Sequence, residues 1–222
     1  MNTNISNNLL KIIKDRRSVR TFNGQKICRE EILSIIETAI WAPTGCNNQE
    51  LKFLILDTTK EIDGIINFKP FLKGVSTIVL IFCDMSLPMS YKMYVEYKHE
   101  KNLPYVDTGL AIANMIVYAK SKSIDSCIFN LSEHHFKLIE KQQKKPIEKK
   151  IDKIKQKLNL HKTMKDNFEF HLRDQLKIPE HLKITCGVGF GFTNRYPNIE
   201  TEKHGNKKVM REEIDYYIIQ KR

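Results

Sequence analysis

The sequence RRSVRTF at residues 16–22 places three arginines and one serine within five positions. A guanidinium group binds phosphate oxygens through paired hydrogen bonds, and a neighbouring hydroxyl adds a further polar contact. The segment is therefore suited to a ligand that carries a phosphate. Apolar residues at helical spacing precede it, so a helix is expected to end here. Arg16 and Arg17 could instead serve only to complement the carboxyl end of that helix dipole.

A second polar stretch, APTGCNNQ at residues 42–49, follows a predicted helix. The helix spans residues 30–41, where apolar residues form one broad face, and Pro43 ends it. Thr44, Asn47 and Gln49 offer a hydroxyl and two amides, which can bind ligand oxygens and nitrogens without carrying net charge. The same residue types are common in turns, so the loop by itself leaves both interpretations open.

The other predicted elements are strands and one long helix. Short apolar runs rich in β-branched residues predict buried strands at residues 52–56, 77–82, 126–129 and 184–192. Residues 104–122 predict a long buried helix, because few polar residues interrupt the stretch. The glycines at 187, 189 and 191 lie inside a predicted strand with no helix after it, which argues against a dinucleotide-binding motif and favours close approach by another group.

Much of the positive charge is concentrated in one segment. The 222 residues carry a formal charge of +11, and residues 137–183 contain 14 Lys and Arg against 7 Asp and Glu. Within this segment Ile147, Ile151, Ile154 and Leu158 have the spacing of an amphipathic helix, so the lysines are interpreted as its solvated face. A basic protein that binds nucleic acid or another polyanion through this face is the alternative, although Phe168 and Phe170 are its only aromatic residues.

Composition and cysteine spacing exclude several classes of protein. A hydrophobic content of 41% with 28% charged residues is that of a globular protein. The longest charge-free runs have 12 residues, so no transmembrane helix is expected, and the first residues do not resemble a signal peptide. These two features predict a cytoplasmic protein. The five cysteines have no CxxC spacing and, being odd in number, cannot all pair, so they are interpreted as reduced thiols. The pair His134-His135 has no further ligand at suitable spacing, so no metal site is predicted.

Together, the two polar motifs and the helix between them resemble the nitroreductase family of flavin enzymes. The family pattern is RRSxRxF, then a helix, then an APSxxNxQPW loop that leads into the first strand. Residues 107–115 and 124–129 resemble the central helix of the family and the strand after it. Thr44 keeps the hydroxyl of the usual serine, whereas Glu50-Leu51 replaces the usual Pro-Trp.

The resemblance implies an α+β fold with a mostly antiparallel sheet of about four or five strands flanked by helices. Residues 1–222 would form a single FMN-binding domain, with a Lys-rich helical insertion at about 137–182. Two subunits would intertwine as a homodimer, and the flavin at their interface would be touched by both chains. Neither a membrane nor nucleic acid is expected as a partner.

The resemblance also implies the residues that bind FMN. Arg16 and Ser18 would reach the phosphate and ribityl chain, and Arg20 would lie near the phosphate or the ring edge. The backbone at Asn130 and Leu131 would donate to flavin N5, and Lys207-Lys208 would close over the phosphate unless it is only a solvated pair. The full predicted set is Arg16, Arg17, Ser18, Arg20, Pro43, Thr44, Asn47, Gln49, Asn130, Leu131, Lys207 and Lys208.

The function implied is the transfer of hydride from NAD(P)H through flavin N5 to a nitroaromatic, a quinone or a similar acceptor. Donor and acceptor would bind in turn, in a ping-pong mechanism. Position and charge would suffice for this chemistry, so no catalytic acid or base is assigned. A flavin-fold enzyme with different chemistry, such as flavin fragmentation or reductive dehalogenation, is a further alternative.

Overall fold

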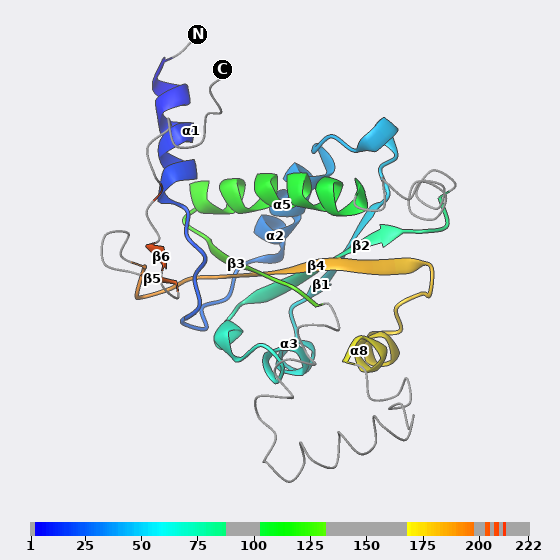
Figure 1. The fold of residues 1–222 in the computed structure, drawn as a ribbon. Helices are drawn as coiled ribbons and strands as arrows, with labels where there is room; N and C mark the ends of the chain where they lie inside the picture. Colours follow the sequence, from blue (N-terminus) through cyan, green and yellow to red (C-terminus); the bar gives the residue numbers. More distant parts are fainter. Residues whose placement is uncertain are drawn as a thin grey trace.

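A four-stranded antiparallel sheet forms the centre of the molecule (Figure 1). The structure is a computed structural model that describes residues 3–87, 103–131, 168–197, 203–204, 207–208 and 211. The strands are β1 (Leu51–Leu56), β2 (Thr77–Asp84), β3 (Asp125–Phe129) and β4 (Leu182–Gly191), in the spatial order β1-β2-β4-β3. The predicted α+β fold with a mostly antiparallel sheet is confirmed, and each predicted strand lies within two residues of its observed bounds.

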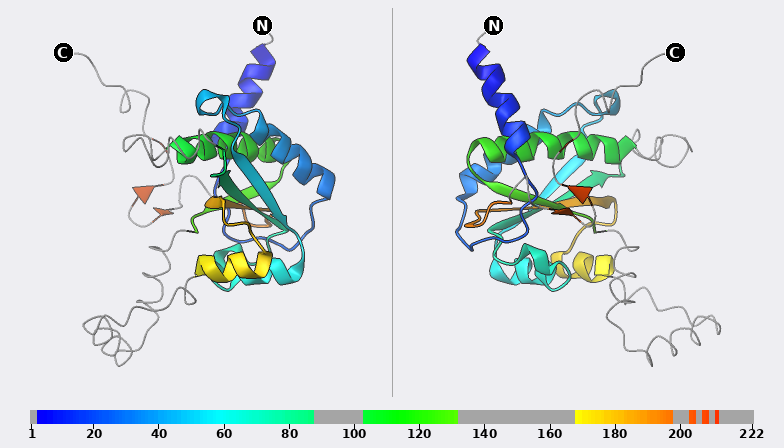
Figure 2. Two further views of the ribbon diagram at one scale, coloured as in Figure 1. Left: turned by 90° about the vertical axis from the view of Figure 1, so that its right-hand side faces the viewer. Right: turned by 60° about the vertical axis from the view of Figure 1, so that its left-hand side comes forward.

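Helices cover both faces of the sheet. On one face lie α2 (Arg29–Ile40) and α5 (Leu103–Ser121), and on the other lie α3 (Thr59–Ile66) and α8 (Phe168–Leu176) (Figures 1 and 2). Every residue of β2 is buried because this central strand is covered on both sides, which explains the apolar run at residues 78–83. Two short 3-10 turns, η1 (Gly45–Asn47) and η2 (Pro70–Leu72), precede β1 and β2.

The segment 16–22 runs along the outer edge of β3. Ser18 forms a parallel bridge with Ser126, and the Val19 N–H donates to the Ser126 carbonyl at 2.9 Å. Val19 and Phe22 are buried in the core, which fixes the polar residues between and before them on the edge of the sheet. The arginine motif is therefore held in place by backbone pairing and by two apolar anchors.

Aromatic rings pack directly against two glycines of β4, where the sequence predicts close approach by another group. A Cβ atom at Gly187 would lie 2.4 Å from Phe129 Cζ, and one at Gly191 would lie 2.7 Å from Phe22 Cδ1. Real Cβ atoms do not approach so closely, so a larger residue at either position would displace the ring. Phe129 immediately precedes the predicted N5 contact, and Phe22 ends the arginine motif, so both glycines support the candidate site.

Helix α1 (Thr3–Asp15) extends away from the body of the molecule (Figure 2). Its apolar residues Ile5, Leu9, Leu10 and Ile13 are each about half exposed or more, with values from 48% to 67%. On α5, Tyr105, Val106 and Leu110 are 40–53% exposed. The prediction that 104–122 is buried throughout is therefore wrong for one face of α5, because nothing in the described chain covers it.

Some predicted features lie outside the described residues. They include most of the Lys-rich insertion, its apolar stripe at 147–158, and the pair His134-His135. Helix α3 was not predicted, although Thr58 and Glu61 form a complete capping box at its start. Among the described residues, no helix is both long and apolar enough to span a bilayer. A hairpin of β5 (Lys203–His204) and β6 (Lys207–Lys208) completes the described elements.

Candidate functional site

Strand β3 connects two of the predicted groups of site residues. The arginine segment pairs with Ser126 near the beginning of the strand, whereas Asn130 and Leu131 follow its end. Four residues of extended chain separate Ser126 from Asn130, which corresponds to about 13 Å. A ligand with a phosphate at one end and a ring at the other could therefore lie along this strand and reach both groups.

A cluster of cations surrounds the start of this path. Burial lowers the pKa of Arg16, the neighbouring Tyr196 raises it, and the charges of Arg17 and Arg211 lower it further. Two further guanidinium groups thus lie close to the half-buried Arg16, where an anion would offset their positive charge. Arg211 was missed by sequence analysis, which took Lys207 and Lys208 instead. Their side chains are not among the described ones, and their role stays a prediction.

Arg17 already has a structural role. Its Nη1 donates to the carbonyls of Lys14 at 2.5 Å and Arg16 at 2.7 Å, at the carboxyl end of α1. Arg17 thus complements the carboxyl end of α1, which is the alternative role that the sequence left open for it. The Nε atom of Arg17 is buried and has no acceptor among the described residues. Direct contact between Arg17 and a cofactor stays a prediction.

Arg20 lies beside β3. Its side chain is exposed, and its positive charge acts on the Cys127 thiol, whose pKa is raised by burial and lowered in part by Arg20. Arg20 thus lies further along the edge of the sheet than Arg16, toward the middle of the strand. The family resemblance implies a cation near the phosphate or the ring edge, and this role of Arg20 stays a prediction.

The loop at residues 42–49 has a strained backbone. Cys46, Asn47 and Gln49 have φ angles of 53°, 54° and 52°, and they are three of the five non-glycine residues with positive φ in the described chain. The Gln49 N–H donates to Thr44 Oγ1 at 3.1 Å, so the threonine hydroxyl helps to hold the turn. Non-glycine residues in this conformation cost free energy and cluster at functional sites.

The loop is anchored to the amino-terminal end of α5. The Gly45 N–H donates to Asp107 Oδ2 at 3.0 Å, and a Cβ atom at Gly45 would lie 2.5 Å from Leu103 Cδ2. The arginine segment lies at the other end of α5, because Ser18 pairs with Ser126, five residues after the helix ends at Ser121. Twelve helical residues separate Asp107 from Ala119, about 18 Å. Within one chain, the structure therefore keeps the loop apart from the arginines.

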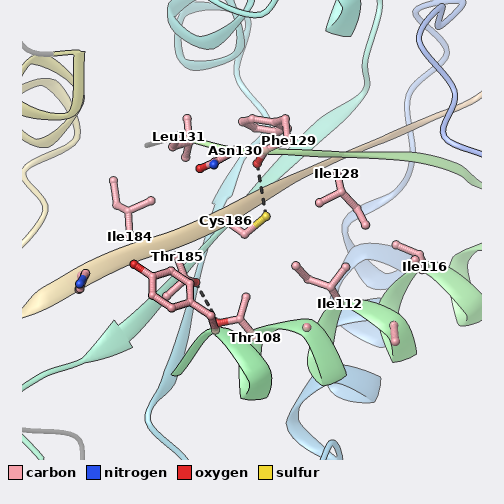
Figure 3. Close-up of a pocket in the computed structure, with 14 residues that line it drawn as sticks. Thr108, Ile112, Ile116, Ile128, Phe129, Asn130, Leu131, Ile184, Thr185 and Cys186 are labelled. Atoms are coloured by element: carbon pink, nitrogen blue, oxygen red, sulfur yellow. Dashed lines mark hydrogen bonds between the residues drawn. The ribbon is translucent and has the colours of Figure 1, made fainter. Parts of the chain in front are cut away.

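A pocket of about 890 Å³ lies between α5 and the ends of β3 and β4 (Figure 3). Ile112 and Ile116 on α5 face Ile128 across it, and Asn130 and Leu131 line it beyond the end of β3. The wall is mainly apolar, which suits a planar aromatic ring. Asn130 and Leu131 are thus at a cavity, as required of a backbone contact to a bound ring.

Three polar side chains that line the pocket form hydrogen bonds within the protein. Thr108 and Thr185 hydroxyls lie 3.0 Å apart, and the Cys186 thiol donates to the Phe129 carbonyl at 3.3 Å (Figure 3). Burial raises the pKa of Cys186 to about 11, so this thiol is protonated at neutral pH and is not a nucleophile. Among the residues described, no cluster of His, Cys, Asp or Glu is suited to a metal ion.

Comparisons with known proteins agree with this geometry. Residues 13–73 match the Nitroreductase family. The Bacillus subtilis protein YdgI, whose name places it among NAD(P)H nitroreductases, is 30% identical over 86 residues, or 36% of this chain and 41% of that protein. The matches to curated relatives span between 41% and 64% of the length of those relatives.

Solved structures extend the likeness beyond the matched segment. The FMN-dependent nitroreductase of Clostridium difficile R20291 has a TM-score of 0.64 at 16% identity, over 95% of this chain and 97% of that chain. A Desulfovibrio desulfuricans protein crystallised in complex with FMN has a TM-score of 0.63 at 16% identity, over 96% of both chains. The chain thus has the α+β fold of the nitroreductases. Its arginine motif and polar loop both lie within the segment that matches the Nitroreductase family.

Proposed function

We propose that the protein is an FMN-dependent oxidoreductase that takes hydride from NAD(P)H and passes it to a nitroaromatic, a quinone or a similar acceptor. The observation that carries the proposal is the placement of Arg16, Ser18 and Arg20 along the edge of the strand that ends at the pocket. Relatives named as NAD(P)H nitroreductases and a similar fold crystallised with FMN support it.

The residues present fit FMN. Arg16 is half-buried with Arg17 and Arg211 close by, and this group of cations suits the charge of a terminal phosphate. The apolar pocket wall would take the flavin ring, and the backbone at Asn130 or Leu131 would donate to N5. Riboflavin has no phosphate for the arginines, so FMN is the better match.

When bound, FMN would supply the hydride-accepting and hydride-donating atom, N5. The chain would contribute position and charge. Arg20 would hold a positive charge beside the ring edge where negative charge develops, and Arg16 would fix the phosphate. Ile112, Ile116 and Ile128 would exclude water from one side of the ring. None of these roles requires a side chain to gain or lose a proton.

We further propose that a second copy of the chain completes the site. Pro43, Thr44, Asn47 and Gln49 lie on the loop that is anchored about 18 Å from the arginines along α5. In a two-fold dimer that pairs the α5 helices, the loop of one protomer could approach the pocket of its partner. The exposed apolar residues of α1 and α5 offer the surface that such a dimer would bury.

Steady-state kinetics test the reaction scheme. Because one pocket would serve donor and acceptor in turn, double-reciprocal plots at several fixed quinone concentrations should give parallel lines. Parallel lines are expected with either NADH or NADPH, whichever is the better hydride donor. Lines that intersect to the left of the vertical axis would mean that donor and acceptor are bound together, which contradicts the ping-pong scheme.

A further inference from the structure

Two carboxyl side chains are buried together where the polar loop meets β1 and α5. Glu50 is 2% exposed and Asp107 is 3% exposed. Asp107 accepts the Gly45 N–H at 3.0 Å, and the Glu50 carbonyl accepts the Asp84 N–H at 2.9 Å. Glu50 occupies the place of the proline in the family pattern, so this carboxyl pair is a feature of this chain that the proposed function does not use.

The Glu50 and Asp107 side chains can form a hydrogen bond to each other only if one of the two carboxyl groups is protonated. Glu50 Oε2 is buried and has no donor among the described residues, although its carboxyl lies in hydrogen-bonding reach of the Asp107 carboxyl. Two neighbouring buried carboxylates would repel each other, and the burial of each charge would cost free energy of desolvation. A protonated Glu50 can donate to the Asp107 carboxylate, which satisfies both groups with one proton.

The surroundings favour this proton. Burial raises the pKa of Glu50, the backbone lowers it, the hydrogen bond and charge of Asp107 raise it, and the Asn48 amide lowers it. Nearby, Asp84 accepts from the Ser86 N–H at 3.0 Å and hydroxyl at 2.6 Å. Its pKa is raised by burial but lowered overall by these bonds and by the charges of His181 and Lys52. Among the described residues, these two basic groups act on Asp84, and the ionisable group acting on Glu50 is Asp107.

We propose that Glu50 donates a hydrogen bond to the Asp107 carboxylate, and that this acid pair latches the loop at residues 42–49 onto the amino-terminal end of α5. Asp107 makes the connection, because the same carboxylate accepts the Gly45 N–H. Glu50 and Asp107 are therefore positioning residues for the loop. Only the consequence for FMN rests on the proposed function, since the latch itself belongs to the folded chain.

The latch makes folding depend on pH in a defined direction. In the folded chain Glu50 holds its proton to a higher pH than its ordinary pKa of 4.5, whereas in the unfolded chain it loses the proton near that value. The stabilisation is thus complete below 4.5 and is lost as pH rises to the folded-state pKa. Within that window, unfolding releases one proton, so the unfolding constant rises tenfold per pH unit from this group alone.

The test compares the full chain, freed of ligand, with Glu50→Gln. The glutamine amide can donate to Asp107 at any pH, so the variant should keep the latch without the proton. Urea unfolding from pH 5 upward should show the ratio of wild-type to variant unfolding constants rising by up to tenfold per unit before it levels. The control Glu37→Gln, at an exposed position on α2, should leave the ratio flat. A flat ratio for Glu50→Gln overturns the proposal.

A second measurement does not require the variant to fold. Infrared spectra of the folded wild-type chain, labelled with carbon-13 glutamate, should show a carboxylic acid C=O band that persists after exposed glutamates have ionised. The absence of a labelled band at that pH overturns the proposal.

The consequence for the cofactor is measured separately. FMN affinity of the wild type should weaken as pH rises through the pair's pKa, whereas that of Glu50→Gln should not follow this step. A pH step of equal size in both proteins would contradict the link between the latch and the loop. If the stability linkage is observed and FMN does not bind at any pH, the latch stands and the proposed function fails.

Discussion

A chain with Leu110→Glu is expected to be a monomer that retains no FMN. Leu110 is 40% exposed on the face of α5 that would pair with a second copy. A two-fold interface would bury the new carboxylate twice, and each unpaired buried charge costs several kcal/mol. Loss of the dimer would remove the partner's loop from the pocket. Light scattering gives the mass, and the ratio of flavin to protein absorbance gives the FMN content.

Phe68→Glu is the matched control for this prediction. Phe68 is 41% exposed, nearly the same as Leu110, but it follows α3 on the opposite face of the sheet (Figure 1). This variant should remain a dimer and keep its flavin. A folded Leu110→Glu monomer with one FMN per chain would contradict the shared site, because it would show that a single chain suffices.

Arg16→Ala is expected to weaken FMN binding about 100-fold while leaving riboflavin binding unchanged. Two charge-assisted hydrogen bonds to a phosphate contribute roughly 3 kcal/mol together, which corresponds to about that factor. Riboflavin lacks the phosphate, so it has no contact to lose. Fluorescence titration of the protein freed of cofactor gives both dissociation constants, and their ratio isolates the contribution of the phosphate.

Arg29→Ala serves as the comparison for Arg16. Arg29 is an exposed arginine at the start of α2 that pairs with Asp57 at 2.6 Å, away from the candidate site. Its replacement should change neither dissociation constant. Equal losses of FMN and riboflavin affinity in Arg16→Ala would show that the arginine supports the fold rather than the phosphate.

Sequence motifs suffice for those parts of the candidate site whose residues are close together in the chain. The RRSVRTF motif occupies seven consecutive residues, and the structure holds it on β3 by backbone pairing of Ser18 and by the buried Val19. The glycines at 187 and 191 likewise predicted that another group packs closely against the backbone there, and these groups are Phe129 and Phe22. These features depend on neighbouring residues or on single steric demands, so one sequence is enough to predict them.

Other parts of the site depend on distant contacts that no pattern encodes. Arg211 approaches Arg16 only in the folded chain, and the burial of Glu50 beside Asp107 requires the loop before β1 to meet α5. Leu110 was expected to be buried because an apolar face on a helix looks the same whether its own core or a second chain covers it. The helix-capping role of Arg17 was foreseen as an alternative, but only the structure placed its guanidinium on the carbonyls of α1.

The most direct test of the proposed function is an anaerobic spectral titration of the purified protein. The account predicts an oxidised-flavin spectrum, bleaching by NADH or NADPH without any acceptor, and return of the colour when a quinone is added. A protein that binds no FMN would contradict the cofactor assignment. A flavin that both NADH and NADPH leave oxidised would contradict hydride transfer from a nicotinamide and would favour a different flavin chemistry in the same fold.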